Sequence, residues 1–204
     1  MKITKFEQSG FIIETDKGFR LALDIANKTP VEKLEGVNTD AMLVSHVHAD
    51  HFSLDQIKKL SPKELYINSE CKEILREEKL FSETIVTKAD TQIRMGDIVV
   101  DIFSVDHGPN VSIKENFGFL ITADNQKIYF AGDMFYESGM DVTNLEVDYA
   151  LLPIGTFYTF GPDEAFAFAK TFKKIGKIIS MHDRGTPGLK DQFLELAKNN
   201  FDVE

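Results

Sequence analysis

Three histidines and one aspartate fall within six residues of this sequence. The segment His46-Val47-His48-Ala49-Asp50-His51 has the pattern H-x-H-x-D-H. With five histidines among 204 residues, the probability of such a pattern by chance is on the order of 10⁻⁴. Imidazole and carboxylate groups bind Zn²⁺ and similar ions at about 2.0–2.2 Å, and alternate residues leaving a strand project to the same side. His46 and His48 can therefore hold one metal ion.

The other half of the motif indicates a second ion. Asp50 and His51 follow a turn at Ala49 and point away from the first pair. A catalytic metal generally takes three protein ligands plus water, so four local ligands do not complete two sites. The missing ligands have to come from other segments. Three candidates follow predicted strands, whose ends can bring side chains together: His107, Asp133 and His182.

The elements that must position these residues are predicted from apolar periodicity. The predicted strands cover residues 4–14, 19–24, 41–45, 64–67, 85–87, 98–105, 118–122, 127–131, 149–152 and 177–181. Helical spacing predicts helices from residue 54, around residues 71–75, over 165–172 and over 189–197. A capping box of Ser53 and Gln56 is expected to begin the first helix. Two strand-rich halves, each with helices, indicate an α/β fold of two sheets packed face to face with helices outside.

Composition and charge exclude several classes of protein. No linker, charge block or internal repeat divides the 204 residues, so residues 1–204 are expected to form a single domain. The net charge is −10, which disfavours binding to nucleic acid or to an anionic membrane. Motifs of serine hydrolases, P-loop NTPases and Rossmann oxidoreductases are absent from the sequence.

The cysteine content and the length of the apolar segments indicate the cellular location of the protein. Cys71 is the single cysteine and is expected to be a packed helix residue in a reducing compartment. The first residues lack the apolar region of a signal peptide, and no apolar run reaches the ~20 residues that span a bilayer. These features predict a cytoplasmic protein without membrane contact.

The ordered motifs resemble the metallo-β-lactamase superfamily. The resemblance rests on the segment 45–51, the lone His107, the pair Gly132-Asp133 and the late His182, with Asp24 closing an early strand. It implies a four-layer αβ/βα sandwich with the site at one edge.

Two further segments narrow the resemblance. Residues 116–119 and 152–155 are similar to those of small metal-dependent hydrolases related to the ascorbate-phosphate lactonase. The sequence departs from these relatives at residues 25–26, at Thr156, where they commonly have glycine, and at Asp183, where they commonly have an aromatic residue. These departures concern the substrate loops and leave the metal ligands unchanged.

The resemblance also implies how the ligands divide between two divalent transition-metal ions, with Zn favoured and Mn or Fe as alternatives. Asp133 would bridge both ions. Asp24 would orient the histidine-rich loop from behind, since ligating imidazoles usually need a hydrogen-bond acceptor. The first ion would be held by His46, His48 and His107, and the second by Asp50, His51 and His182.

The leading functional hypothesis is a dinuclear hydrolase that uses a metal-bridging hydroxide to cleave a small, anionic ester, lactone or phosphodiester. Asp50 and Asp133 are the predicted catalytic residues, with Asp50 accepting or returning a proton. Arg184 and Tyr158 lie near the predicted site loops, although solvated side chains are the simpler interpretation. The expected partner is a small-molecule substrate, and the oligomeric state stays open.

Three alternatives remain at this stage. A nuclease of the same superfamily fits the ligands, but such enzymes usually add a basic arm or an inserted domain. A metal-binding sensor or scaffold without turnover is compatible with the sequence, although seven ligands exceed what a structural zinc site requires. A di-iron redox role resembling the flavodiiron proteins is disfavoured, because their pattern has Glu at the position of His48.

Overall fold

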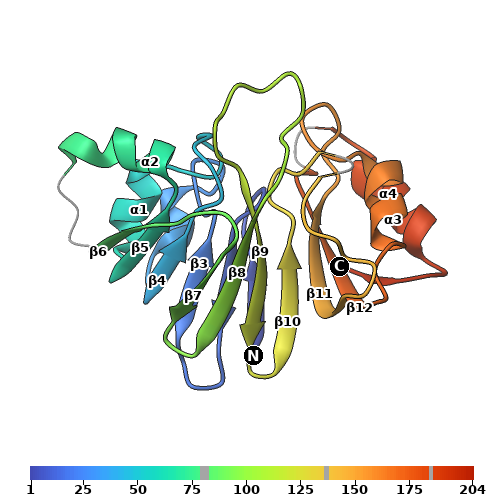
Figure 1. The fold of residues 1–204 in the computed structure, drawn as a ribbon, viewed down its shortest axis with the longest axis horizontal. Helices are drawn as coiled ribbons and strands as arrows, with labels where there is room; N and C mark the ends of the chain where they lie inside the picture. The colour runs from blue at the N-terminus through green and yellow to red at the C-terminus, as the bar shows by residue number, and fades with distance from the viewer. Residues whose placement is uncertain (79–82, 136–137, 184–185) are drawn as a thin grey trace.

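Two β-sheets face each other in the computed structural model of the protein (Figure 1). The structure describes residues 1–78, 83–135, 138–183 and 186–204. In the first sheet β1 to β3 are antiparallel, whereas β3 to β6 run parallel. This sheet has six strands in chain order: β1 (Lys2–Lys5), β2 (Phe11–Glu14), β3 (Arg20–Leu23), β4 (Ala41–Leu43), β5 (Glu64–Ile67) and β6 (Glu83–Val86).

The second sheet has seven strands in the order β13-β12-β11-β10-β9-β8-β7. Its first half is an antiparallel meander from β7 to β10, and β10 to β13 are parallel. The strands are β7 (Thr91–Met95), β8 (Ile98–Ser104), β9 (Phe117–Ala123), β10 (Gln126–Phe130), β11 (Glu146–Pro153), β12 (Lys174–Met181) and β13 (Asp202–Val203).

Helices cover the outer faces of both sheets (Figure 1). The first sheet carries α1 (Leu54–Leu60) and α2 (Ser69–Ile74), and the second carries α3 (Pro162–Ala169) and α4 (Leu189–Ala197). Two short 3₁₀ turns, η1 (Val31–Leu34) and η2 (Leu75–Glu77), complete the connections. The predicted four-layer α/β sandwich is therefore confirmed.

Both faces of the first sheet bury apolar side chains. In β2, Phe11 and Ile13 point between the sheets, whereas Ile12 belongs to the outer cluster beneath α1 and α2. Phe11 meets Phe130 of the second sheet edge to face, with ring centroids 6.3 Å apart. Fully burying a phenylalanine or isoleucine side chain contributes roughly 1.5–3 kcal/mol to the free energy of unfolding. Cys71 is completely buried in the outer cluster, as the sequence predicts.

The strands that precede the predicted ligands end at one edge of the sandwich. β8 and β10 run in the same direction because each pairs antiparallel with β9 between them, and β12 is parallel to β10 through β11. Their carboxyl ends therefore meet, and β4 of the first sheet ends beside them (Figure 1). The loop between β1 and β2 reaches the same edge, since β2 is antiparallel to β3.

Some predicted elements differ from the structure. The predicted strand 4–14 is interrupted by a turn at residues 6–10, in which the backbone N–H of Phe6 donates to the carbonyl of Gly10. The strands β7 and β13 were not predicted. The helix predicted over 165–172 ends at residue 169. In the second predicted helix, Ile74 is the last residue of α2 and is 51% exposed.

The predicted capping box of the first helix is wrong. Ser53 stands at the N-cap of α1 but makes no capping hydrogen bond with its side chain. Gln56 instead donates from Nε2 to the backbone carbonyl of Thr29 at 2.9 Å. Gln56 bonds to this distant carbonyl and not to the start of the helix. Its side chain is buried, and a buried amide needs a hydrogen-bond partner.

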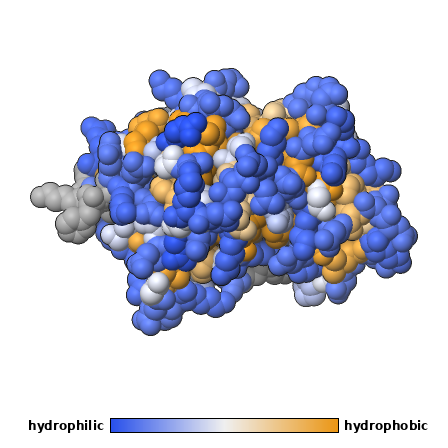
Figure 2. Space-filling view, turned by 90° about the horizontal axis from the view of Figure 1, so that it is seen from below, coloured by the Kyte–Doolittle hydropathy of each residue, from blue (hydrophilic) through white to orange (hydrophobic). Residues whose placement is uncertain are grey.

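Figure 2 views the end of the sandwich opposite to the metal-ligand candidates. Hydrophilic side chains cover most of this face, with small apolar areas between them. In the part of the chain that the structure describes, the helices are too short or too polar to cross a membrane.

Candidate metal centre

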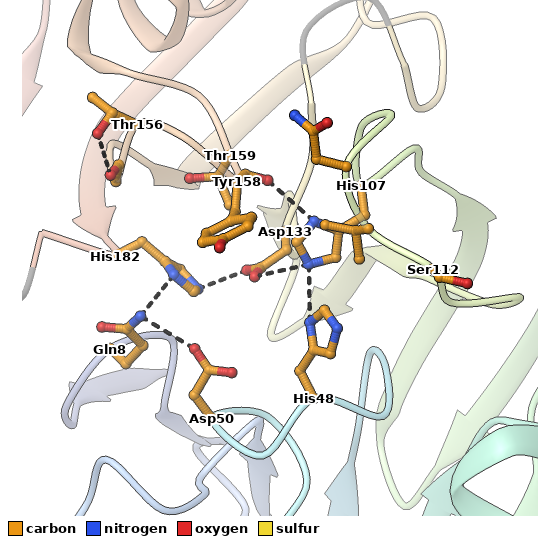
Figure 3. A pocket seen from close by; sticks show the side chains of 13 residues that line it. Gln8, His48, Asp50, His107, Ser112, Asp133, Thr156, Tyr158, Thr159 and His182 are labelled. Atoms are coloured by element: carbon orange, nitrogen blue, oxygen red, sulfur yellow. Dashed lines mark hydrogen bonds and ion pairs between the residues drawn. The ribbon is translucent and has the colours of Figure 1, made fainter.

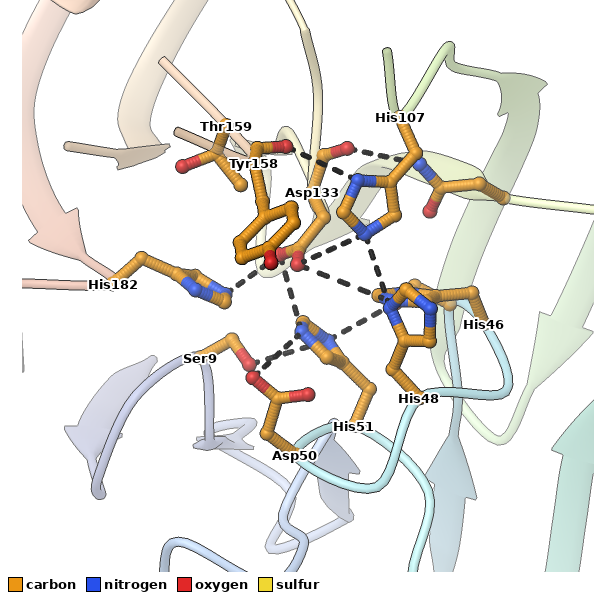
Figure 4. Close-up of polar contacts among 12 residues, drawn as sticks. Ser9, His46, His48, Asp50, His51, His107, Asp133, Tyr158, Thr159 and His182 are labelled. Carbon is orange, nitrogen blue, oxygen red and sulfur yellow. Dashed lines mark hydrogen bonds and ion pairs between the residues drawn. The ribbon is translucent and has the colours of Figure 1, made fainter. Parts of the chain in front are cut away.

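The structure brings all seven predicted ligands together at the edge where the strand ends meet. The loop after β4 supplies His46, His48, Asp50 and His51, and the loops after β8, β10 and β12 supply the other three. They form two groups whose potential ligand atoms lie within 4.8 Å of one another (Figure 4). The first group is His46, His48, His107 and Asp133, and the second is Asp50, His51 and His182.

The first group converges through ring nitrogens. His48 Nδ1 lies 3.0 Å from His46 Nε2 and 3.2 Å from His107 Nε2. Asp133 Oδ2 is 3.3 Å from His107 Nε2 and 3.9 Å from His46 Nε2. Ligands bound at about 2.0–2.1 Å in a tetrahedron are roughly 3.3 Å apart, so these separations fit a shared divalent ion.

The second group uses the other oxygen of the same aspartate. Asp133 Oδ1 lies 3.1 Å from His51 Nε2 and 2.6 Å from His182 Nε2. His51 Nε2 is 3.9 Å from Asp50 Oδ2. Each oxygen of Asp133 therefore faces one of the two groups.

Unpaired polar atoms at the centre fit a metal. Among the described residues, the buried atoms His51 Nε2, His182 Nε2 and Asp133 Oδ1 make no hydrogen bond of acceptable geometry, although they lie within ion-pair distance of one another. Leaving a buried donor or acceptor unpaired costs about 1–3 kcal/mol, and more for a charged group. A divalent cation satisfies all three atoms at once, because lone pairs of imidazole and carboxylate are its usual ligands.

Backbone geometry directs Asp133 toward both groups. Gly132 has φ +60, and a Cβ there would lie 2.6 Å from the carbonyl oxygen of Phe117. Only glycine fits this turn without displacing the neighbouring strand. The amide of Asn116 donates to the carbonyl of Asp133 at 2.9 Å and fixes the turn from the other side.

Asp24 lies behind the histidine-rich loop. Its Oδ2 is 2.7 Å from His51 Nδ1, and its carboxylate accepts hydrogen bonds from the backbone N–H and the hydroxyl of Ser45. Bonding at Nδ1 leaves Nε2 of His51 free to face Asp133. The hydroxyl of Ser9, 3.2 Å from His51 Nδ1, belongs to the same network.

The pKa values of these groups reflect their crowding. Burial, followed by repulsion from His51, holds the pKa of His46 well below its usual value. Burial opposes the charged form of His51 as well, but the carboxylates of Asp133 and Asp24 outweigh it and raise the pKa of His51 well above normal. Although burial disfavours its ionised form, Asp133 keeps a strongly lowered pKa because His182 and His51 surround it.

Gln8 is a site residue that the sequence analysis missed. Its Nε2 lies 2.8 Å from His182 Nδ1 and donates to Asp50 Oδ2 at 3.3 Å (Figure 3). The amide thus contacts one ligand from each sheet. The backbone N–H of His182 also donates to the carbonyl of Gln8, at 3.4 Å. The sequence pattern predicts a continuous strand through Gln8. In the structure Gln8 has φ +62, a conformation that its residue type does not reveal.

We expect Gln8→Ala to weaken metal binding at the second group by about 10- to 100-fold, as loss of a partner behind metal ligands generally does. The measurement is competition with a chromophoric chelator. Lys17→Ala, on the exposed turn after β2, is the matched control. Equal affinities for both variants and the original chain would show that Gln8 has no part in holding Asp50 and His182.

A cavity of about 510 Å³ opens above the two groups (Figure 3). Its floor includes five of the ligand candidates, and its walls come from the loops after β8 and β11. Tyr158 is 53% exposed and lines this cavity. Asp183 lies outside it, 4.0 Å from the ammonium group of Lys5, and Arg184 lies outside the described residues.

Comparison with known proteins identifies the family of the chain. The family model of the beta-lactamase superfamily domain matches residues 2–182. A UPF0173 metal-dependent hydrolase of Thermococcus onnurineus is 30% identical, with 87% of this chain and 83% of the relative covered. Another, from Methanosphaera stadtmanae, is 28% identical over 98% of this chain and 91% of the relative.

Solved structures share the fold. The metallo-hydrolase Igni18 from Ignicoccus hospitalis superimposes with a TM-score of 0.80 at 21% identity, covering 99% of this chain and 93% of that chain. From the sequence matches and the common fold, we conclude that the chain belongs to the beta-lactamase superfamily, within the UPF0173 metal-dependent hydrolases.

Proposed function

We propose that the protein is a dinuclear metal-dependent hydrolase. The supporting observation is Asp133, whose two carboxylate oxygens face different groups of ligand candidates. One ion is assigned to His46, His48 and His107, the other to Asp50, His51 and His182, with Asp133 shared. Mixed nitrogen and oxygen ligands suit Zn, Mn and Fe comparably, and Zn²⁺ is the ion proposed here.

When bound, divalent cations in this position lower the pKa of a water molecule and polarise the scissile group. The residues of the chain supply the rest of the chemistry. Asp50 lines the cavity and is held by Gln8, so its carboxylate is oriented to accept the proton that the attacking water loses. The buried histidines exclude bulk solvent from the floor, which strengthens the electrostatic interactions there.

The cavity favours a small molecule as the substrate. Of the described residues that line it, none is Lys or Arg, so the bound cations must supply the positive charge for an anionic substrate. The walls offer neutral hydrogen-bonding groups instead, from Asn110, Ser112, Thr156, Tyr158 and Thr159. A small ester, lactone or phosphodiester, neutral or anionic, matches this lining. The net charge of −10 opposes a polynucleotide.

The test is a panel of hydrolysis assays with 4-nitrophenyl acetate, γ-butyrolactone and bis(4-nitrophenyl) phosphate. Each assay compares protein loaded with Zn²⁺, Mn²⁺ or Fe²⁺ with chelator-treated protein. Turnover that requires metal supports the proposal. Full metal loading without turnover of any substrate favours a sensor or scaffold, and tight, salt-sensitive RNA binding without small-molecule turnover favours a nuclease.

A further inference from the structure

Tyr158 presents a hydroxyl group to the reaction space. Its ring lies between His182 and His107 in both close-up views, with the phenol end directed toward Asp133 (Figures 3 and 4). The residue lines the cavity and is 53% exposed. Within the described part of the chain, this hydroxyl makes no hydrogen bond. It is thus a donor without a hydrogen-bond partner among the described residues.

The loop that carries Tyr158 has an unfavourable backbone conformation. Thr156 and Phe157 have φ +57 and +60, a region that favours glycine and is rare for a β-branched residue. Such a conformation is strained for residues other than glycine, and strain of this kind clusters at functional sites. Hydrogen bonds keep the loop in place, from the N–H of Thr156 to the carbonyl of Phe160 at 3.0 Å and from the N–H of Tyr158 to the carbonyl of Thr156 at 2.6 Å.

The same loop contacts a ligand candidate on each side. The backbone carbonyl of Tyr158 lies 3.1 Å from His107 Nδ1. Gly155 approaches His182 so closely that a Cβ would lie 2.7 Å from its carbonyl oxygen. The backbone at Tyr158 is therefore held close to both groups.

The position of Tyr158 determines which substrate oxygen can receive the proton of its hydroxyl group. In ester hydrolysis negative charge develops on the carbonyl oxygen and on the leaving oxygen. Metal ions held by the floor residues would polarise the carbonyl oxygen and the attacking water. A leaving oxygen would then face the cavity wall to which Tyr158 belongs.

We propose, on the basis of the proposed function, that Tyr158 is a catalytic residue that donates its proton to the leaving oxygen of a small ester or lactone. A bond forms between the water oxygen and the carbonyl carbon. The bond from that carbon to the leaving oxygen breaks, and its electron pair stays on the leaving oxygen, which takes the proton of Tyr158. The phenolate regains the proton that Asp50 accepted from the water, so that ester and water yield acid and alcohol.

The experiment compares Tyr158→Phe with the original metal-loaded chain on two acetates that differ only in the leaving group. For ethyl acetate, whose alcohol leaves poorly, kcat falls by at least ~100-fold, within the range of general-acid catalysis. For 4-nitrophenyl acetate, whose phenolate leaves without a proton, kcat changes less than ~3-fold, because no acid is required. The control is Tyr149→Phe, the same change at a half-buried tyrosine of β11 that is not among the described residues lining the cavity.

A binding measurement tests the residue without turnover. Ethyl methylphosphonate has a tetrahedral centre and an ester oxygen in place of the leaving oxygen. Calorimetry should give about tenfold weaker binding to Tyr158→Phe, the effect of one lost hydrogen bond, at unchanged metal content. Equal losses on both acetates, or equal phosphonate affinities, would overturn the role of Tyr158. A wild-type chain that binds the phosphonate but cleaves no ester, lactone or phosphodiester of the panel would instead refute the proposed function.

Discussion

Asp133→Asn is expected to reduce hydrolysis by more than 100-fold while the chain stays folded. Loss of a partner behind metal ligands already costs about 10- to 100-fold, and Asp133 is assigned a direct position between both ions. The amide keeps the size of the carboxylate, so the buried turn after β10 remains filled. It cannot offer an anionic oxygen to each group of histidines, and the shared position is lost.

The measurement combines kcat, metal content and circular dichroism of the variant. Asp202→Asn is the matched control, since among the described residues its exposed carboxylate pairs with Lys177 at the surface, 3.6 Å away. Such surface pairs contribute little to stability. A fully active Asp133→Asn variant with both metal equivalents would rule out the bridging role.

Much of the site could be predicted because its ligands follow directly from strand ends. The motif from His46 to His51 is local in sequence, and His107, Asp133 and His182 each come within three residues of a strand. The apolar patterns of β4, β8, β10 and β12 mark those strands well, since they are buried between layers. The direction of each strand then places its end at the common edge.

Residues that support the ligands could not be predicted in the same way. Gln8 reaches the site only because a turn interrupts the expected strand 4–14, and the turn depends on hydrogen bonds between its own backbone groups. The sequence places Tyr158 near the site loops, but its place in the cavity wall depends on two residues with positive φ, which their side chains do not favour. The strand β7 has exposed residues at Thr91, Gln92 and Arg94, so its apolar pattern is too weak to detect. In each case tertiary contacts override the backbone conformation that the local sequence favours.

Metal removal is expected to abolish hydrolysis and to lower the melting temperature by about 8–16 °C. Elemental analysis of chain purified without chelator should give close to two transition-metal equivalents. A ligand present at 1,000 times its dissociation constant stabilises the folded state by about 4.1 kcal/mol. For a chain of this size each kcal/mol corresponds to about 2–4 °C. Unchanged melting temperatures and a metal content near zero would contradict the assignment.

The difference in melting temperature between the metal-loaded and the metal-free chain should depend on pH. Deprotonation of His51 destabilises the metal-free chain but favours metal binding. In the metal-free chain its pKa is raised by Asp133 and Asp24, although burial opposes this. That contribution to stability is full below the unfolded pKa, about 6.5, and is lost as the pH rises toward the folded pKa. Metal binding requires neutral His51 and releases its proton, so metal affinity increases over the same range. The difference in melting temperature between loaded and metal-free chain therefore widens from pH 6 to pH 8, and a gap that narrows would exclude His51 as a ligand.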